Sequence, residues 1–213
     1  TIMRKSTIFS SGNLRRQIFK MMAIGVAGIF SASVANGQMS AGTYYIDGGQ
    51  PTGGNSYQSF AAFFSALNTA GNAISSPGIV LKVKPQANGY NEQFSVPSIS
   101  GLGPIQGGES RLIIRGDGTA NTRIHYAASS STNSYSVVFM NGAGYVTLDS
   151  LIIENTASSG YNYAVKVFKG SEHVDVTNST LKVRTNGYSS GYAYVIAYSD
   201  GTTSPSGDAT NPK

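Results

Sequence analysis

The sequence predicts an all-β protein: a right-handed parallel β-helix, a solenoid whose short strands stack coil upon coil, with a capping α-helix near its N-terminal end. Two observations lead to this prediction. The second half of the chain repeats itself at an offset of 28 residues, and no apolar stripe of helical period follows residue 77. A repeat of this length holds about three short strands and has no room for a crossover helix, which is typical of one β-helix coil.

Residues 1–37 have the three-part order of a secretory signal peptide. A basic stretch ends at Lys20, an apolar run covers 21–30, and small residues follow, so cleavage is expected after Ala35 or Gly37. The apolar run is too short to span a bilayer. We therefore expect an exported mature chain without a transmembrane span, secreted or held at the outer cell surface; a buried core helix is the alternative.

The positive charge of the chain lies in this leader. The 15 Lys and Arg exceed the 10 Asp and Glu, but five basic residues and no acidic ones precede residue 38, so the remainder is neutral. A neutral chain does not attract polyanions, and we expect no nucleic-acid partner. Because the chain has no cysteine, an exported fold must be stabilised by buried area alone.

One amphipathic helix is expected near the N-terminal end. Four apolar residues occupy positions i, i+3, i+4 and i+7 of a single stripe, namely Phe60, Phe63, Phe64 and Leu67. Ser56 or Ser59 is expected to cap the start of the helix, and Gly71 its end. Such a helix would cover an open β-helix end, where apolar core and unpaired strand edges invite aggregation.

Four segments follow from this pattern: the leader (1–37), an N-terminal cap (38–76), the parallel β-helix coils (77–201), and a flexible insertion or truncated tail (202–213). Within the coils, 135–142 recurs at 163–170 and 145–149 recurs at 173–177, while a third copy begins at Tyr192. Alternation then predicts interior ladders of Val137 over Val165, Val146 over Val174, and Leu148 over Val176.

Eight residues are expected to be buried in these ladders: Val137, Phe139, Val146, Leu148, Val165, Val167, Val174 and Val176. Glu154 and Lys182 share the 28-residue offset and should stack as a pair of opposite charge. A β-sandwich with coincidental spacing is the alternative fold, and Asn141-Gly142 is a candidate for its hairpin turn.

From Thr43 to about Asp200 the chain resembles the secreted right-handed β-helix repeat proteins of Gram-negative bacteria, many exported by the type IX route, with a pectin-lyase-like fold. Four segments carry the resemblance: 42–46 before a glycine-rich turn, the expected helix 60–68, 78–83 followed by 89–94, and the run 145–154. The resemblance implies an N-terminal cap followed by the first coils. The family's C-terminal sorting domain has no counterpart in this sequence.

Asp149 and Asp175 are the weak candidates for catalysis. They are expected on the outer face of one sheet, diagonal to each other beside Thr147 and Thr177, with attachment points about 8 Å apart. This lies within the span of about 6.5–9.5 Å of an inverting carbohydrate hydrolase. No arginine is expected in register with them, and we favour an ordinary solvated face over a catalytic pair.

Other candidate ligand residues are equally weak. Tyr161, Tyr188 and Tyr198 are candidates for stacking on sugar rings, but an aromatic ladder in or at the corner of a coil is favoured. His125 and His173 are expected to be outward strand residues, and Arg115-Gly116-Asp117 a turn rather than a recognition motif. We expect no metal site and no cofactor.

Three functions remain open: a non-catalytic exported scaffold, which is favoured and for which adhesion is one role; a polysaccharide lyase or glycoside hydrolase; and a carbohydrate-binding module. The expected partner is a polysaccharide or cell-surface glycan. No second strand is expected after the glycine turn at Asp200-Gly201, because 202–213 contains no branched aliphatic residue. We therefore expect an N-terminal fragment of a longer protein that self-associates through its open C-terminal coil.

Overall fold

A computed structural model of the chain describes residues 37–118, 122–129, 135–158, 161–168, 170–184 and 193–199. The predicted leader, apart from its last residue, and the predicted tail (202–213) lie outside the described residues. Tyr188 and Tyr192 also lie outside them.

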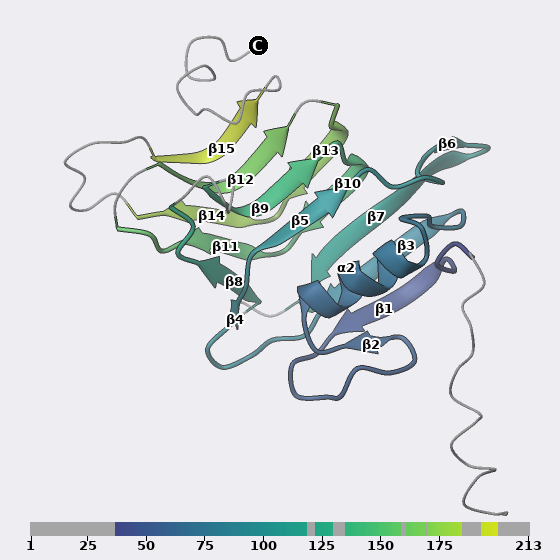
Figure 1. Cartoon of the computed structure of the whole chain (residues 1–213), viewed down its shortest axis with the longest axis horizontal. Helices are drawn as coiled ribbons and strands as arrows, with labels where there is room; N and C mark the ends of the chain where they lie inside the picture. Colours follow the sequence, from purple (N-terminus) through teal and green to yellow (C-terminus); the bar gives the residue numbers. More distant parts are fainter. Residues whose placement is uncertain are drawn as a thin grey trace, which may run out of the picture. The chain divides into compact units, whose positions relative to one another are not determined.

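Three sheets of parallel strands form the fold, and they confirm the predicted β-helix (Figure 1). Sheet A stacks β1 (Gly42–Ile46), β3 (Gly78–Val83), β7 (Gly108–Gly116), β10 (Gly144–Asp149) and β13 (Glu172–Thr177). Sheet B stacks β4 (Tyr90–Asn91), β8 (Arg123–Tyr126), β11 (Ile152–Asn155) and β14 (Thr180–Val183). Sheet C stacks β5 (Phe94–Pro97), β9 (Ser136–Asn141), β12 (Asn162–Phe168) and β15 (Ala193–Ser199).

Successive strands along the chain enter successive sheets. The sets β3–β4–β5, β7–β8–β9, β10–β11–β12 and β13–β14–β15 are therefore coils of one solenoid, and β1 begins the stack in sheet A. Two short strands lie outside this scheme: β2 (Ser56–Tyr57) extends sheet A beyond β1, and β6 (Gly103–Ile105) forms an antiparallel hairpin with β7. Asn141 ends β9, and the chain then continues into another sheet, so the sandwich hairpin does not form.

The core consists of apolar ladders that run along the stack. In sheet A, Ile79, Leu112, Val146 and Val174 occupy one ladder, and Leu81, Ile114, Leu148 and Val176 occupy the next. The predicted pairs in this sheet are thereby confirmed. Val146 and Leu148 are fully buried, but Val174 and Val176 are only partly so. The reason is that β13 has no further strand stacked on it among the described residues.

The predicted register of sheet C is wrong by one residue. Val165 pairs with Val138, an offset of 27, so Val137 does not lie over Val165. Tyr135, from which the repeat was counted, has a left-handed backbone with φ 57°, and the strand begins only at Ser136. The third copy is shifted too, since Tyr163 pairs with Tyr194 rather than with Tyr192.

This shift moves two of the predicted ladder residues. Val137 is buried as predicted, but on the opposite face of the strand from Val138. Phe139 is half-buried and contacts Phe168, with ring centroids 5.6 Å apart. Val167 packs against the core but is only partly buried.

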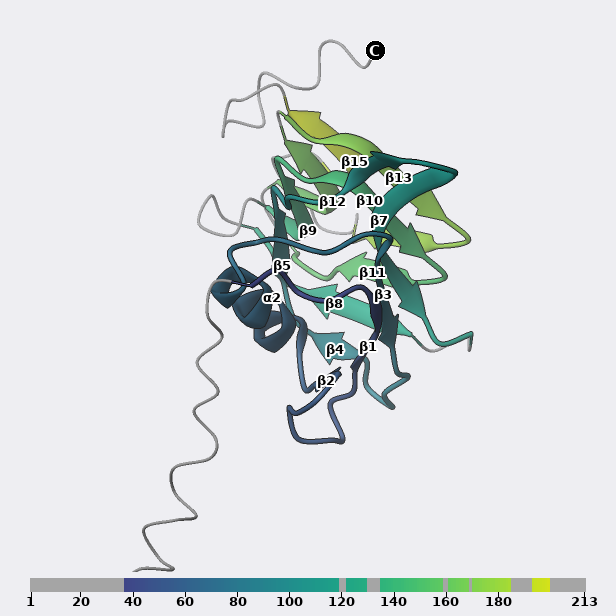
Figure 2. The ribbon, with the colours of Figure 1, turned by 90° about the vertical axis from the view of Figure 1, so that its right-hand side faces the viewer.

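The helix α2 (Phe60–Thr69) lies beside β5, at the end of sheet C (Figure 2). Its predicted stripe is confirmed, because Phe60, Phe63 and Leu67 are fully buried and Phe64 is partly buried. The rings of Phe60 and Phe94 stack with centroids 4.3 Å apart. The helix thus takes the place that a strand of sheet C occupies in later coils, and it covers the apolar end of that sheet.

Side-chain hydrogen bonds close the first end of α2, and a left-handed glycine closes the second. Ser59 Oγ accepts from Ala62 N at 3.0 Å, as an N-cap does. Glu92, from the next coil, accepts from Phe60 N at 3.0 Å and from Ala61 N at 3.4 Å. At the other end Gly71 has a φ of 69°, which confirms the predicted left-handed stop.

A buried asparagine fixes the corner between sheets B and C. Asn155 Nδ2 donates to Ala128 O at 2.8 Å and to Tyr163 O at 3.1 Å, while its Oδ1 accepts from Ala128 N and Ala157 N. These bonds satisfy backbone groups at a bend where no sheet partner is available. Nothing in the apolar pattern of the chain indicates this role of Asn155.

Candidate functional site on the outer face of sheet A

The outer face of sheet A holds both predicted carboxylates. Thr147 lies beside Asp175 and Asp149 beside Thr177, as the 28-residue offset predicts. The alternation of the strands is responsible, since Val146 and Leu148 point inward and the residues between them point outward. Two neighbouring coils therefore present their acidic side chains on one surface.

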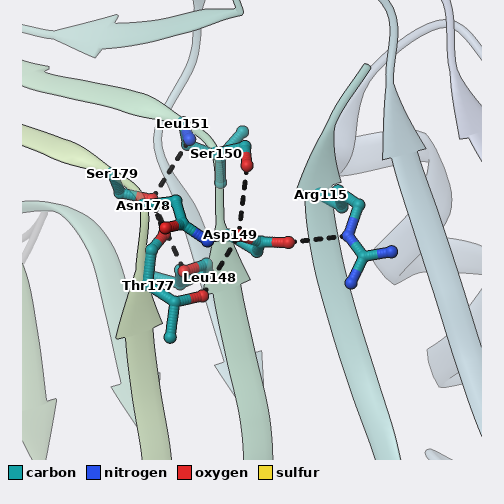
Figure 3. A network of polar contacts seen from close by, with 8 residues as sticks. All are labelled: Arg115, Leu148, Asp149, Ser150, Leu151, Thr177, Asn178 and Ser179. Atoms are coloured by element: carbon teal, nitrogen blue, oxygen red, sulfur yellow. Dashed lines mark hydrogen bonds and ion pairs between the residues drawn. The ribbon is translucent and has the colours of Figure 1, made fainter. Parts of the chain in front are cut away.

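Asp149 is held by four hydrogen bonds and is only 8% exposed (Figure 3). Its Oδ2 accepts from Arg115 Nε at 2.7 Å. Its Oδ1 accepts from Asn178 Nδ2 at 3.0 Å, and from the hydroxyls of Ser150 and Thr177 at 3.1 Å each. Burial raises the pKa of Asp149, but these four bonds favour the charged form and outweigh it, so the pKa lies below its ordinary value.

The same network fixes the turns that follow β10 and β13. Ser150 and Asn178 stand at equivalent positions after these strands, and both have left-handed backbones, with φ of 57° and 49°. Ser179 Oγ accepts from Leu151 N at 3.1 Å, which links the two turns directly (Figure 3). Asp149 is therefore a structural centre of this corner of the solenoid.

Asp175 is more exposed and is bound by one arginine. Arg111 Nη1 donates to Asp175 Oδ2 and, at 2.7 Å, to Thr147 Oγ1. Arg111 Nε donates to Glu109 Oε2 at 2.7 Å. One guanidinium thus bridges two carboxylates across three strands, which neutralises much of the charge of Asp175.

The expectation that no arginine lies in register with these acids is wrong. Arg115 pairs directly with Asp149, at an offset of 34 residues, because the coil before β10 is longer than the coil after it. A fixed period of 28 residues does not place Arg115 beside Asp149. The pair becomes visible when the inward residues of segment 111–115 are aligned with those of segment 145–149.

The other described sequence candidates differ in how far the fold engages them. Asp117 pairs with Lys84 at 2.6 Å, Gly116 is buried, and Arg115 is bound to Asp149, so all three residues of the Arg-Gly-Asp segment are engaged. The ring of Tyr161 meets that of Tyr135 edge-on, with centroids 5.6 Å apart. Tyr198 pairs with Val167 in register and is 58% exposed.

The two histidines lie on strands, and one belongs to the outer face of sheet A. His173 is exposed and stacks on Tyr145, with centroids 4.4 Å apart and an interplanar angle of 11°. His125 Nε2 lies 3.0 Å from Asn88 O. Sequence reasoning missed the stacking of His173 on Tyr145, although the 28-residue offset between the two residues places their rings on neighbouring strands.

A shallow hollow on the same face was also not expected. It has a volume of about 370 Å³, and its lining includes Thr43, Val80 and Ile113 from three adjacent strands. Glu109 and Arg111 line it as well, beside the β6–β7 hairpin. The hollow thus combines outward apolar side chains with an ion pair, 2.7 Å between Arg111 Nε and Glu109 Oε2.

Within the described parts of the chain, no three His, Asp or Glu side chains gather in a way that would hold a metal ion. No helix in those parts is long and apolar enough to cross a membrane. Comparison of the chain with protein-family models, curated proteins and solved structures finds no match. The fold and the outer face of sheet A are therefore the basis for the functional proposal.

Proposed function

We propose that the chain is a non-catalytic, exported β-helix scaffold that is secreted or displayed on the outer cell surface and contacts glycans or other surfaces through its outer faces. The observation that carries this proposal is the state of the two candidate acids. Each is bound by an arginine, and the pKa of Asp149 is lowered rather than raised.

A carbohydrate hydrolase of the inverting type needs one carboxyl group that is protonated at working pH, so that it can donate to the leaving oxygen. Four hydrogen bonds keep Asp149 ionised, and its position leaves only 8% of it exposed to a substrate. Asp175 is exposed to water and is ion-paired with Arg111, so no burial sets it apart as a proton donor. Neither group fits the role of the general acid.

Export is supported by the sequence of the leader, with its basic, apolar and small-residue parts in order. The resemblance to secreted β-helix repeat proteins of Gram-negative bacteria supports the same proposal, and the solenoid fold agrees with it. A surface built of outward strand residues on a rigid ladder is suited to repeated weak contacts with a glycan.

A carbohydrate-binding module is the second candidate, and the outer face of sheet A favours it. The hollow beside Arg111 offers apolar contacts next to charged donors and acceptors, and the exposed ring of His173 lies on the same face. Sugar recognition uses this combination of ring stacking and directed hydrogen bonds.

A polysaccharide panel separates these functions. The protein is incubated with each polysaccharide, and reducing ends, unsaturated products and bound protein are measured. We expect no turnover, and the same result for Asp149→Asn and Asp175→Asn. Binding that is lost on Ile113→Asp, a change in the lining of the hollow, would favour the module. Turnover that either asparagine variant abolishes would make the chain an enzyme and refute the scaffold.

A further inference from the structure

Two basic residues stand side by side on the outer face of sheet A. Lys82 of β3 pairs in register with Arg115 of β7, and Tyr45 of β1 lies on the other side of Lys82. The spacing of neighbouring strands puts the attachment points of the two cations about 4.8 Å apart. Like charges in directly opposite positions repel each other. This cation doublet, Lys82 and Arg115, is therefore unfavourable unless an anion lies between its members.

The ion pairs that the described residues form on this face do not include Lys82. Arg115 is bound to Asp149 through Nε at 2.7 Å, and its two terminal nitrogens make no bond to that carboxylate (Figure 3). Lys84, the next outward residue after Lys82, is bound to Asp117 at 2.6 Å. Lys82 itself makes no hydrogen bond or ion pair with any residue that the structure describes. Its Nζ and the terminal nitrogens of Arg115 are thus donors that a ligand can use.

The shallow hollow adjoins the cation doublet. Val80, which lines the hollow, precedes Lys82 by two residues on β3. Ile113, also in the lining, precedes Arg115 by two residues on β7. Residues two apart in a strand lie on one face, about 6.6 Å from each other. Both apolar side chains are partly exposed. A partly exposed apolar surface the length of one sugar ring therefore ends at a row of positive charge.

The other end of the hollow carries a carboxylate. Arg111 lies two residues before Ile113, and its Nε is bound to Glu109 at 2.7 Å. Its Nη1 is bound to Asp175, so this arginine has two acidic partners. Glu109 repels an anion but accepts hydrogen bonds from hydroxyl groups. A sugar in the hollow is thus oriented, with an acidic substituent toward Lys82 and hydroxyl groups toward Glu109.

We propose that this part of the outer face binds a sulfated glycan. One sulfate group lies between Lys82 Nζ and the terminal nitrogens of Arg115. The sugar ring that carries it lies against Val80 and Ile113. This inference rests on the proposed contact of the protein with glycans and names the class of glycan. Sulfate suits the doublet because its three terminal oxygens point in different directions and accept from both cations at once. The two oxygens of a carboxylate lie in one plane, and one guanidinium satisfies them alone.

Oligosaccharides that differ in their acidic groups test the proposal. Binding of the full chain to a dextran oligosaccharide, to its sulfated form and to an oligogalacturonate of equal length is measured by calorimetry at physiological salt. We expect the sulfated form to bind at least about tenfold more tightly than the other two. Equal binding with and without sulfate overturns the sulfate site but leaves the contact with glycans standing. Binding of none of the three refutes both. Tighter binding of the oligogalacturonate contradicts the assignment to sulfate.

Lys82→Gln locates the site. We expect it to weaken binding of the sulfated oligosaccharide about tenfold. Lys182→Gln, on sheet B beside Glu154, removes the same charge and is the matched control that should leave binding unchanged. Without ligand, Lys82→Gln should unfold at the wild-type temperature or slightly above it, because repulsion from Arg115 is relieved; a lysine with a structural role would lower that temperature. Unchanged binding by Lys82→Gln, or equal weakening by both variants, contradicts the proposed site.

Discussion

The environment of a carboxylate decides its chemistry more than its spacing from a second one does. Asp149 and Asp175 occupy the diagonal that the repeat predicts, yet each faces an arginine. Hydrogen bonds from Arg115 and Asn178 favour the ionised form of Asp149 and oppose the effect of its burial. The carboxylate therefore contributes to folding in its charged state.

Acid should weaken the fold through Asp149. A folded-state pKa below the unfolded value of about 3.8 means that the contribution of this carboxylate is present above that value and is lost as pH falls through the folded pKa. We expect Asp149→Ala to lower the free energy of unfolding at pH 7 by about 2–3 kcal/mol, since hydrogen bonds to a charged group are lost. Urea unfolding at pH 7 and pH 3 measures both effects.

Asp175→Ala is the matched control. This carboxylate is exposed and its arginine keeps Glu109 as a partner, so the loss should stay below about 1 kcal/mol. Equal losses for the two variants at pH 7, or an acid dependence unchanged by Asp149→Ala, would mean that the hydrogen bonds of Asp149 add nothing to stability.

At the scale of the element, α2 depends on a side chain from the neighbouring coil. Glu92 accepts from the first two backbone N–H groups of the helix, where the helix dipole also favours a negative charge. Burial of Glu92 raises its pKa, and the two backbone bonds only partly oppose this. The stability of the packed helix therefore depends on the protonation state of Glu92.

Glutamine at position 92 should remove this linkage. Because the folded pKa lies above the ordinary 4.5, the folded chain holds the proton more tightly, so this stability is present at low pH and lost as pH rises through the folded pKa. We expect Glu92→Gln, which keeps an acceptor without the charge, to be at least as stable as the wild type at pH 7. Glu92→Ala should lose about 1 kcal/mol. A wild-type chain that gains stability over Glu92→Gln between pH 4 and 7 would contradict this.

Two positions of one ladder should respond differently to a charge. Val146 is fully buried between β7 and β13, so Val146→Asp should cost several kcal/mol, on the order of an unpaired polar group in the core. Val174, one coil later, is only partly buried, and Val174→Asp should cost clearly less. Thermal unfolding of both variants at low protein concentration measures the difference, and equal losses would argue against the stacked register.

Sequence patterns predicted the ladders of sheet A and the stripe of α2, because alternation and helical period depend on local geometry. The register of sheet C was missed by one residue, since the left-handed turn at Tyr135 removes a residue from the strand without changing the apolar pattern. The arginine opposite Asp149 was missed for a related reason: the preceding coil is longer by six residues. Loop length, which a fixed period ignores, determined both errors.

At the scale of the whole molecule, each coil contacts only its neighbours, so stability is distributed along one axis. Strands of sheet A such as β7 and β10 are paired on both sides, whereas β13, β14 and β15 are paired on one side within the described structure. Opening should therefore begin at this edge and proceed inward.

Amide hydrogen exchange should follow this order. We expect the slowest exchange in β10 and β7, and faster exchange in β13 and β14, because loss of the last coil exposes few other hydrogen bonds. The measurement is made on dilute protein, so that association does not protect the edge. Uniform protection across all strands would indicate one cooperative unit instead.

The unequal lengths of the coils have a consequence for how such a protein can change. Phe94 and Val138 pair across an offset of 44 residues, and Val138 and Val165 across 27, yet both pairs meet in the same ladder. The coils thus share a common cross-section, although the number of residues that forms each coil differs. The corners accept additional segments, such as the β6–β7 hairpin, while the stacked sheets that they connect keep their pairing. New contacts with the surroundings can be gained there one loop at a time, without redesign of the core.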